Sequence, residues 1–265
     1  MKIATYNINS INARIENLCT WLRSESPDIV LLQEIKTEFN SFPFFEIQSC
    51  GYNASILGQK SYNGVAILSR EKIKIIHENL PSFADDQSRY LEADISVNGT
   101  VFRVASVYLP NGNPPYNNSN DNSKFEYKLK WMDAFISHIK ELSTLPYPVI
   151  IGGDFNVIMT EKDVYDPKPF IGNALFRPEV REKIQNLAFL GFFDVFRTLH
   201  PTENGYTFWD YTANSLNADF GMRIDYFFAS APAVDRLTDC HVDKAPRYSD
   251  KPSDHTPLIA EFLQC

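Results

Sequence analysis

The chain has 265 residues, a formal net charge of −8 and 44% hydrophobic residues, with 20 Phe and 13 Tyr. This composition supplies a sizeable core and excludes a wholly disordered chain, while the acidic balance argues against DNA binding driven by net charge alone. No apolar run approaches the roughly 20 residues of a membrane span, and the N-terminus reads as a strand rather than a secretion signal. We therefore expect one domain over residues 1–265, cytoplasmic and without a membrane partner.

The first half of the chain predicts mainly strands. Alternation at 3–8 and apolar runs at 29–32 and 64–69 indicate strands, and the spacing of Ile15, Leu18 and Leu22 indicates a helix over residues 14–24. Residues 90–97 alternate between apolar and polar, and Asn98-Gly99 is a hairpin signal before a return strand at 100–108.

The second half predicts longer elements. Residues 111–123, with six Asn and two Pro, predict an exposed loop before a helix whose apolar stripe is Phe125, Leu129, Met132, Phe135, Ile136 and Ile139. A buried strand at 149–151, a loop at 163–169 and a helix from about residue 178 follow, and then strands at 206–209, 224–229 and 258–262. Hairpins mixed with buried apolar runs predict two packed sheets with helices outside them.

The stretch Val149-Ile150-Ile151-Gly152-Gly153-Asp154-Phe155-Asn156 is the most informative one. Residues two apart in an extended segment project from the same face, so Asp154 and Asn156 can address one target. An ordinary Asx-type turn explains the same residues. What favours function is that other predicted strands also end in polar residues, namely Asn7, Glu34, Tyr108, Asp225, Asp254 and His255. Ligands and catalytic groups of sheet proteins gather at such strand ends.

Five ordered segments resemble the motifs of the exonuclease III branch of AP endonucleases, within the DNase I-like endonuclease/exonuclease/phosphatase superfamily. They are Gln33-Glu34-Ile35-Lys36, Tyr108-Leu109-Pro110-Asn111-Gly112, Gly153-Asp154-Phe155-Asn156, Gly221-Met222-Arg223-Ile224-Asp225 and Ser253-Asp254-His255. The resemblance runs from residue 2 to residue 262. It implies an α/β (α+β) fold, a four-layered sandwich of two packed mixed β-sheets flanked by helices.

The resemblance also implies the roles of individual residues. Glu34 is expected to be the principal Mg²⁺ ligand, with Mn²⁺ as a substitute, and Asp254, Asn9, Asp154 and Asn156 complete the expected metal set. Asp154, held by Asn7 and Asn156, is expected to activate water. His255, oriented by Asp225, and Tyr108 are expected to contact the scissile phosphate.

Substrate contacts are the third implication. Phe208, Met222 and Ile224 are expected to line an apolar pocket for a deoxyribose that lacks its base. The further expected contacts are Asn111, Asn173 and Arg177, with Asp163 as an accessory polar position and Lys36, Arg181, Arg223 and Lys251 as a basic track. Met222 stands where relatives often carry a bulkier wall, and the Asn-rich insertion after Gly112 lengthens a loop that borders DNA in relatives.

The leading hypothesis is a Mg²⁺-dependent, monomeric DNA repair nuclease, bacterial in type and associated with the nucleoid while acting. It would cut duplex DNA 5′ to abasic sites and trim 3′ ends by 3′-5′ exonuclease activity. The alternatives are a phospholipid or inositol-phosphate phosphodiesterase that shares the metal core, and a non-catalytic relative that binds DNA ends.

Overall fold

The computed structural model describes residues 1–114, 121–212 and 214–264. It contains two six-stranded sheets. In spatial order, sheet A consists of β11 (Leu237–Val242), β12 (Leu258–Phe262), β1 (Lys2–Asn7), β2 (Ile29–Gln33), β4 (Val65–Ser69) and β3 (Asn53–Leu57). Sheet B consists of β5 (Ile73–His77), β6 (Tyr90–Val97), β7 (Thr100–Tyr108), β8 (Val149–Asp154), β10 (Asp225–Ser230) and β9 (Phe192–Asp194). In sheet A the pair β1–β2 is parallel, and in sheet B the pair β7–β8 is parallel, while every other neighbouring pair of strands is antiparallel.

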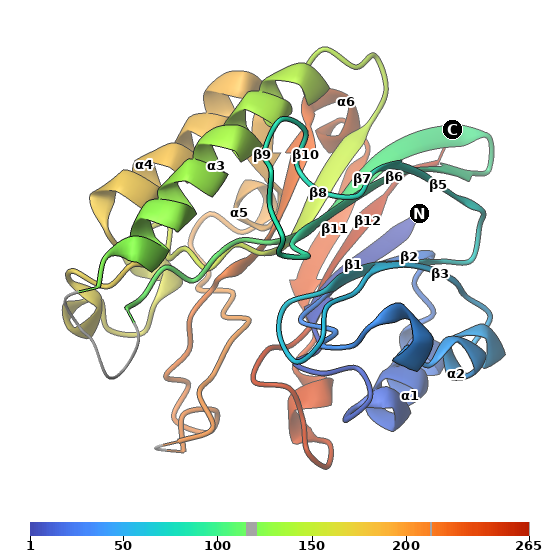
Figure 1. Cartoon of the computed structure of the whole chain (residues 1–265), viewed down its shortest axis with the longest axis horizontal. Coiled ribbons are helices and arrows are strands. Elements are labelled where there is room, and N and C mark those ends of the chain that lie inside the picture. The colour runs from blue at the N-terminus through green and yellow to red at the C-terminus, as the bar shows by residue number, and fades with distance from the viewer. Residues whose placement is uncertain (115–120, 213, 265) are drawn as a thin grey trace.

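Helices on the two outer faces make four layers (Figure 1). They are α1 (Ile15–Glu25), α2 (Phe44–Ser49), α3 (Ser123–Leu142) and α4 (Pro178–Gln185). The short helices α5 (Val195–Leu199) and α6 (Ala231–Val234) instead contribute Val195, Phe196 and Ala233 to the cluster between the sheets. Helices α1 and α2 cover sheet A, and α3 and α4 cover sheet B. The expected four-layered sandwich is therefore confirmed.

The central strands are apolar on both sides because both of their faces are buried. In β2, Leu31 packs in the cluster between the two sheets, whereas Leu32 packs against the α1 side. In β8, Ile150 faces the other sheet and Ile151 faces α3. This arrangement explains the unbroken apolar runs in the sequence, because alternation appears only where one face of a strand is solvated.

One glycine in β8 is required by close packing. A Cβ atom on Gly153 would lie 1.9 Å from the carbonyl oxygen of Val107 in the neighbouring strand. No side chain fits there, so Gly153 lets β7 and β8 bring Tyr108 opposite Asp154. This pairing places two of the predicted functional residues side by side.

One expectation differs from the structure, and another lies partly outside the described residues. Residues 206–209 form no named strand, and Phe208 makes only isolated bridges to Met222 and His255. The aromatic residues of this segment favour extended backbone, but its hydrogen bonds are made across loops. Of the Asn-rich segment 111–123, residues 115–120 lie outside the described part.

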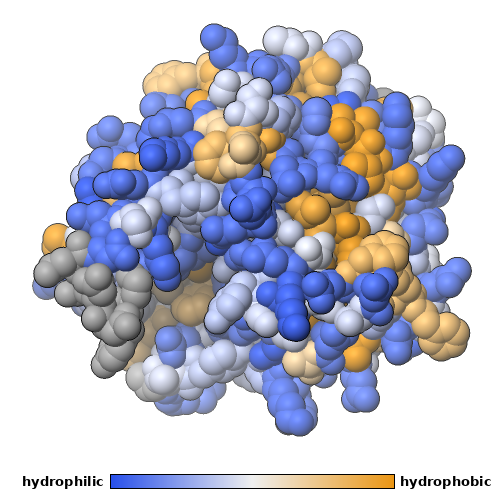
Figure 2. Space-filling view, in the orientation of Figure 1, coloured by the Kyte–Doolittle hydropathy of each residue, from blue (hydrophilic) through white to orange (hydrophobic). Residues whose placement is uncertain are grey.

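The outer surface mixes polar and apolar residues, as Figure 2 shows for one face, where hydrophobic residues gather to the right of the centre. In the described part of the chain, no helix is both long enough and apolar enough to cross a membrane.

Candidate active site where the two sheets end

The candidate site lies where strands of both sheets end together. Sheet A contributes Asn7 from the end of β1 and Glu34 just after β2. Sheet B contributes Tyr108, Asp154 and Asp225, which are adjacent in register because β8 pairs with β7 on one side and with β10 on the other. The packing of the sheets thus brings together side chains that are far apart in the sequence, such as Asn7 and Asp225.

The Asn7 amide joins the two sheets at this point. Its Nδ2 donates to Glu34 Oε1 at 2.9 Å and to Asp154 Oδ2 at 3.0 Å. The Tyr108 hydroxyl donates to the same Glu34 oxygen at 2.9 Å. The carboxyl groups of Glu34 and Asp154 are therefore held close together by the hydrogen bonds that Asn7 and Tyr108 donate to them.

The backbone at several of these positions is left-handed. Glu34 has φ 50°, Asn156 has φ 48° and Asn9 has φ 46°. Asn tolerates this region, but for Glu it is uncommon and costs roughly 1–2 kcal/mol. A hydrogen bond of the next residue holds the backbone of Glu34 in this conformation, because Ile35 N donates to Gly64 O at 3.1 Å. The backbone is thus held where it aims the carboxylate at the site.

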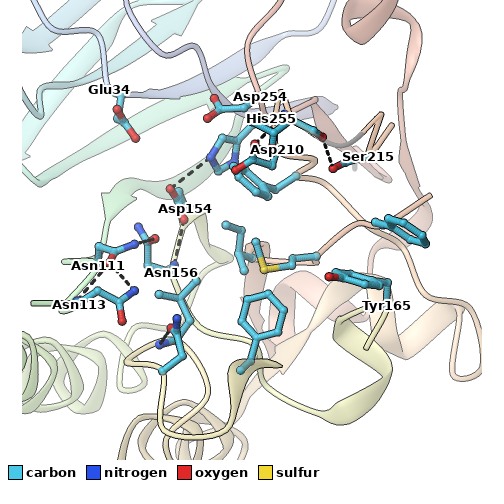
Figure 3. Close-up of a pocket in the computed structure, with 18 of the residues that line it drawn as sticks. Glu34, Asn111, Asn113, Asp154, Asn156, Tyr165, Asp210, Ser215, Asp254 and His255 are labelled. Atoms are coloured by element: carbon cyan, nitrogen blue, oxygen red, sulfur yellow. Dashed lines mark hydrogen bonds and ion pairs between the residues drawn. The ribbon is translucent and has the colours of Figure 1, made fainter. Parts of the chain in front are cut away.

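The His255 imidazole lies between two carboxylates. Its Nδ1 is 2.8 Å from Asp225 Oδ2. Its Nε2 is 3.7 Å from Asp154 Oδ2, an ion pair that Figure 3 marks with a dashed line. Thr207 Oγ1 donates to the same Asp225 oxygen at 2.6 Å, and the Phe208 ring packs edge-on against the imidazole at 5.0 Å. The imidazole, both carboxylates and Thr207 are buried, and Phe208 is half-buried, so the imidazole is held in place by its neighbours while it still lines the cavity.

The electrostatics of this cluster are strongly perturbed. Burial raises the pKa of Asp154 to about 7, with Asp225 and Glu34 adding to the rise. Burial alone would lower the pKa of His255, but Asp225 and Asp154 outweigh it and raise that pKa to about 10. Burial alone would raise the pKa of Glu34, yet the Lys36 ammonium and the Asn7 amide bring it below its ordinary value. At neutral pH, His255 is therefore an imidazolium and Asp154 is poised near its titration midpoint.

An apolar pocket opens beside the cluster. Phe208, Met222 and Ile224 line a cavity of about 540 Å³ that also contains Glu34 and Asp154 (Figure 3). Its other apolar walls are Tyr165, Phe170, Leu175 and Phe220, which the sequence reading missed. Tyr165 and Phe220 stack on each other with ring centroids 4.8 Å apart. Both residues lie in irregular segments, where the sequence has no helical or strand periodicity from which their burial could be predicted.

The comparisons with known proteins agree with this geometry. Residues 4–255 match the endonuclease/exonuclease/phosphatase family model. The chain belongs to this family. It is 31% identical over 270 residues to an exodeoxyribonuclease III from Haemophilus influenzae, covering 99% of this chain and 100% of that protein.

Two solved structures are similar along their whole length. An AP endonuclease from Archaeoglobus fulgidus is 34% identical, with a TM-score of 0.90 and 99% of both chains covered. A 3′ phosphatase from Neisseria, bound to a product DNA hairpin, is 34% identical, with a TM-score of 0.91 and 100% of both chains covered. The resemblance to the exonuclease III and AP endonuclease family and the DNase I-like fold are thereby confirmed.

Family members of this class depend on metal, and the oxygen donors present fit a hard divalent cation. Glu34 Oε2 and Asn9 Oδ1 converge on the Lys36 ammonium at 2.7 Å and 2.6 Å, so a positive group already sits between two of the predicted ligands. Asn9 Nδ2 in turn donates to Asp254 Oδ1 at 3.0 Å. Asp154 and Asp225 share the imidazolium of His255, and Asp210 and Asp254 line the same cavity, so the site is rich in carboxyl groups that can attract a divalent cation.

Asn156 differs from its expected role in one respect. Its backbone N–H, not its side chain, donates to Asp154 Oδ1 at 2.9 Å. Its side-chain amide donates to Leu109 O and accepts from Asn111 Nδ2, both at 3.0 Å. The Asn156 side chain therefore fixes the neighbouring loop, and Asn173 also lines the pocket while its Oδ1 accepts from Leu175 N at 2.9 Å.

A buried lysine that the sequence reading missed ties these loops together. Lys128 Nζ donates to the carbonyl oxygens of Asn111, Asn156 and Ala174 at 3.0, 2.7 and 3.1 Å. Burial lowers its pKa to about 7. The signal was available, because Lys128 follows Phe125 by three residues and precedes Met132 by four, which places it on the buried stripe of α3.

The expected basic track needs correction at Arg223. This side chain is wholly buried and pairs with Asp163 and Asp194, so it cannot face DNA, and Asp163 is its internal partner. Arg177 does not line the pocket; its guanidinium lies over the Phe125 ring and pairs with Glu179. Its contact with a substrate stays a prediction.

Proposed function

We propose that this protein is a Mg²⁺-dependent DNA repair nuclease that hydrolyses the phosphodiester 5′ to abasic sites and also trims 3′ ends. The observation that carries the proposal is the buried imidazolium of His255, held between Asp225 and Asp154 in a site rich in carboxyl groups. The imidazolium complements the charge of a phosphodiester, and the carboxyl groups complement the charge of a divalent cation. The relatives named exodeoxyribonuclease III, AP endonuclease and 3′ phosphatase support the same reading.

The protein's own groups divide the chemistry between them. Asp154, with its pKa raised to about 7, accepts a proton from the attacking water. Asn7 fixes the Asp154 carboxylate through a 3.0 Å hydrogen bond. His255 donates from Nε2 to a phosphate oxygen, while Asp225 holds the proton on Nδ1 and keeps the ring in place. Tyr108 also lines the cavity, and a phosphate oxygen can take the hydroxyl hydrogen bond that Glu34 Oε1 accepts in this structure.

Glu34, Asn9 and Asp254 would hold the metal ion, which supplies charge neutralisation at the phosphate when bound. Mg²⁺ is favoured because the donors are carboxylate and amide oxygens. Substitution by Mn²⁺, a monomeric state, a cytoplasmic location and the nucleoid association stay predictions.

The pocket supports the choice of abasic DNA. A deoxyribose without its base is slim and costs less to rotate out of the stack than an intact nucleotide. Phe208, Met222 and Ile224 offer it apolar walls beside the cluster. Selection by shape needs no hydrogen bond to a base.

One assay tests the proposal directly. A duplex with a single abasic analogue, a duplex with a recessed 3′ end, one with a 3′-phosphate and an inositol-phosphate ester are each incubated with Mg²⁺ or EDTA. We expect Mg²⁺-dependent cleavage 5′ to the abasic site and 3′ trimming, with no release of phosphate from the inositol ester. Cleavage of the inositol ester alone would replace the proposal by the phosphodiesterase alternative, and DNA binding without cleavage would favour a non-catalytic relative.

Glu34→Gln tests the metal assignment, because it removes the charge and keeps the shape. We expect the rate at limiting Mg²⁺ to fall by at least about 10²-fold while DNA binding persists, since even partners of metal ligands are worth 10–100-fold. Glu38→Gln, an exposed carboxylate four residues away, is the matched control. Near-normal turnover of Glu34→Gln at limiting Mg²⁺ would remove Glu34 from the metal site.

A further inference from the structure

A second cluster of metal-binding side chains lies outside the candidate active site. His77, Glu92 and His138 each offer a ligand atom, and these atoms lie within 4.8 Å of one another. His77 ends β5, Glu92 belongs to β6 and His138 lies on α3. None of the three lines the cavity at the candidate active site.

A β-bulge brings His77 to this place. The register of β5 and β6 shifts between Ile75 and His77, so that His77 is paired with Glu92 and not left on the opposite face. Bulges commonly re-aim one side chain at the edge of a sheet. Here the extra residue, Ile76, turns an imidazole on the edge strand toward a carboxylate whose side chain is wholly buried.

The three groups approach the geometry of a transition-metal site. His138 Nε2 lies 2.6 Å from Glu92 Oε2. The rings of His77 and His138 are adjacent and perpendicular, with centroids 5.3 Å apart. Ligand atoms around a tetrahedral zinc ion, with bonds of about 2.0–2.1 Å, stand roughly 3.3–3.5 Å from each other. The ligand atoms of His77, Glu92 and His138, which lie within 4.8 Å of one another, would therefore have to move by little more than about an ångström to reach these spacings.

The partners around the cluster are those that accompany metal ligands. His138 Nδ1 lies 3.3 Å from the carboxylate of Glu141, one turn further along α3. Glu92 accepts from Arg103 Nη1 at 2.6 Å and from the Tyr90 hydroxyl at 2.5 Å. A carboxylate behind the far nitrogen of a ligating histidine, and donors behind a ligating carboxylate, orient such ligands.

An ion-pair network alone explains part of this cluster but not all of it. Glu92, Arg103, Tyr90 and His138 satisfy one another without any contribution from His77. His77 is partly exposed, which opens the cluster toward solvent. A neighbouring cavity of about 160 Å³, lined by Ser82, Ser137 and Glu141 among others, also reaches His138. An ion thus has a route of entry, and water has room to complete its coordination.

We propose that His77, Glu92 and His138 form a binding site for Zn²⁺ or a similar transition-metal cation, separate from the magnesium site. Two imidazoles and one carboxylate suit zinc, whereas Mg²⁺ prefers oxygen ligands and keeps its waters. A bound ion would link edge strand β5, its neighbour β6 and helix α3, and would clamp this helix to the sheet.

The test is equilibrium dialysis of the full chain against Zn²⁺ in the presence of excess Mg²⁺, which occupies the oxygen site. We expect one Zn²⁺ per chain that Mg²⁺ does not displace. His77→Asn should weaken this binding by at least about 100-fold, and Glu141→Gln, which acts on His138, by about 10–100-fold. His241→Asn is the matched control, because His241 forms a comparable but half-exposed pair with Asp239 at 2.7 Å.

A spectroscopic measurement separates this site from binding elsewhere. Co²⁺ bound at a tetrahedral site with nitrogen ligands should give visible absorption that His77→Asn abolishes and His241→Asn preserves. The melting temperature in EDTA checks that His77→Asn is folded, as its partly exposed position leads us to expect. Equal Zn²⁺ affinity in the parent and in His77→Asn, or no Zn²⁺ retained above Mg²⁺, would overturn the proposal. Neither result bears on the nuclease activity, which is measured separately.

Discussion

Arg223 and Asp225 stand on either side of Ile224, yet they belong to two buried charge clusters of opposite design. Arg223 Nε lies 2.7 Å from Asp163 Oδ1, and its Nη1 lies 2.8 Å from Asp194 Oδ2. Arg197 adds a second guanidinium 2.8 Å from Asp163. Two carboxylates meet two guanidinium groups, so this structural cluster is electrically balanced.

The candidate active-site cluster on the other side is not balanced, because Asp154 and Asp225 share the imidazolium of His255. Asp225 Oδ1 has no hydrogen-bond partner among the described residues, but the same is true of Arg223 Nη2 and Asp194 Oδ2 in the structural cluster, so the difference lies in the charges. A buried cluster whose charges balance stabilises the fold, whereas one that is rich in carboxyl groups and lines a cavity can bind a cation. The two clusters should therefore respond in opposite ways to the loss of a charge.

The largest effect is expected from Asp225 and His255. Asp225→Asn removes the carboxylate that orients and charges the imidazole, and His255→Ala removes the imidazole itself, so each should lower kcat by about 10⁴-fold. The double variant should lose little more, since groups that act as one unit are not additive. Turnover on the abasic duplex at saturating Mg²⁺ is the measurement, with His241→Ala as the control. Fully multiplicative losses would show that the two residues act separately.

Breaking the structural cluster should harm stability and spare activity. Asp163→Asn removes the carboxylate that pairs with Arg223 and Arg197, and Arg223 is wholly buried. The unpaired buried charge should lower the free energy of unfolding by about 3–5 kcal/mol. Urea unfolding measures this loss, and kcat per folded molecule should stay within about twofold of the parent. Asp133→Asn, which removes the exposed partner of Lys183, should cost no more than about 1 kcal/mol. A drop in kcat as large as that of Asp225→Asn would erase the distinction between the clusters.

A smaller effect is expected at the pocket wall that adjoins the catalytic cluster. Phe208→Ala widens the cavity, so the preference for abasic over intact duplex should fall by about 10-fold, as for other changes of apolar pocket shape. Met222→Trp should raise that preference by narrowing the cavity. The ratio of abasic cleavage to 3′ exonuclease rate is measured for each variant. An unchanged ratio in both would show that these side chains do not select the substrate.

The smallest effect, taken per unit of pH, is a pair of opposite pH dependences in EDTA. Burial alone would raise the pKa of Asp163, but Arg223 brings it below 3.8, so its stabilising contribution is present above about pH 4 and is lost as the pH falls through the folded value. Asp154 has its pKa raised to about 7, so its favourable contribution is present below pH 3.8 and is lost as the pH rises through 7.

Urea unfolding between pH 3 and 8 separates these two slopes. The destabilisation caused by Asp163→Asn should shrink in acid. Asp154→Asn should gain stability relative to the parent as the pH rises from about 4 to 7, by no more than about 1.4 kcal/mol per pH unit. Parallel curves for the parent and both variants would contradict the assignment of the charges.

What the sequence predicts well here is whatever depends on local pattern. The apolar runs of β2 and β8 predicted strands buried on both faces, and the polar residues at strand ends, such as Glu34 and Asp154, are the ones the sheets bring together. The edge strands β3, β5, β9 and β11 were missed because they are short and only partly buried, so their residues show neither a clear run nor a clear alternation. Residues 206–209 were wrongly predicted as a strand, since intrinsic preference yields to tertiary contacts.

Contacts between residues that are far apart in the chain could not be predicted from the sequence. Asp163 and Arg223 are 60 residues apart, and nothing local distinguishes a buried arginine from one that faces DNA. The same holds for the stacking of Tyr165 on Phe220, which depends on how two loops approach each other. Lys128 is a different case, because helical periodicity marked its position and only its charge argued against burial.

The left-handed backbone of Glu34, Asn9 and Asn156 has a consequence for how this protein can change under selection. Glycine adopts such φ values freely, so at each of these positions it would relieve the backbone, and at Glu34 it would also remove one of several crowded negative charges. A screen that rewarded heat resistance alone would therefore be free to replace these residues, and the enzyme would lose its chemistry while its fold persisted. Only a population that is continually tested for turnover should keep a glutamate at position 34.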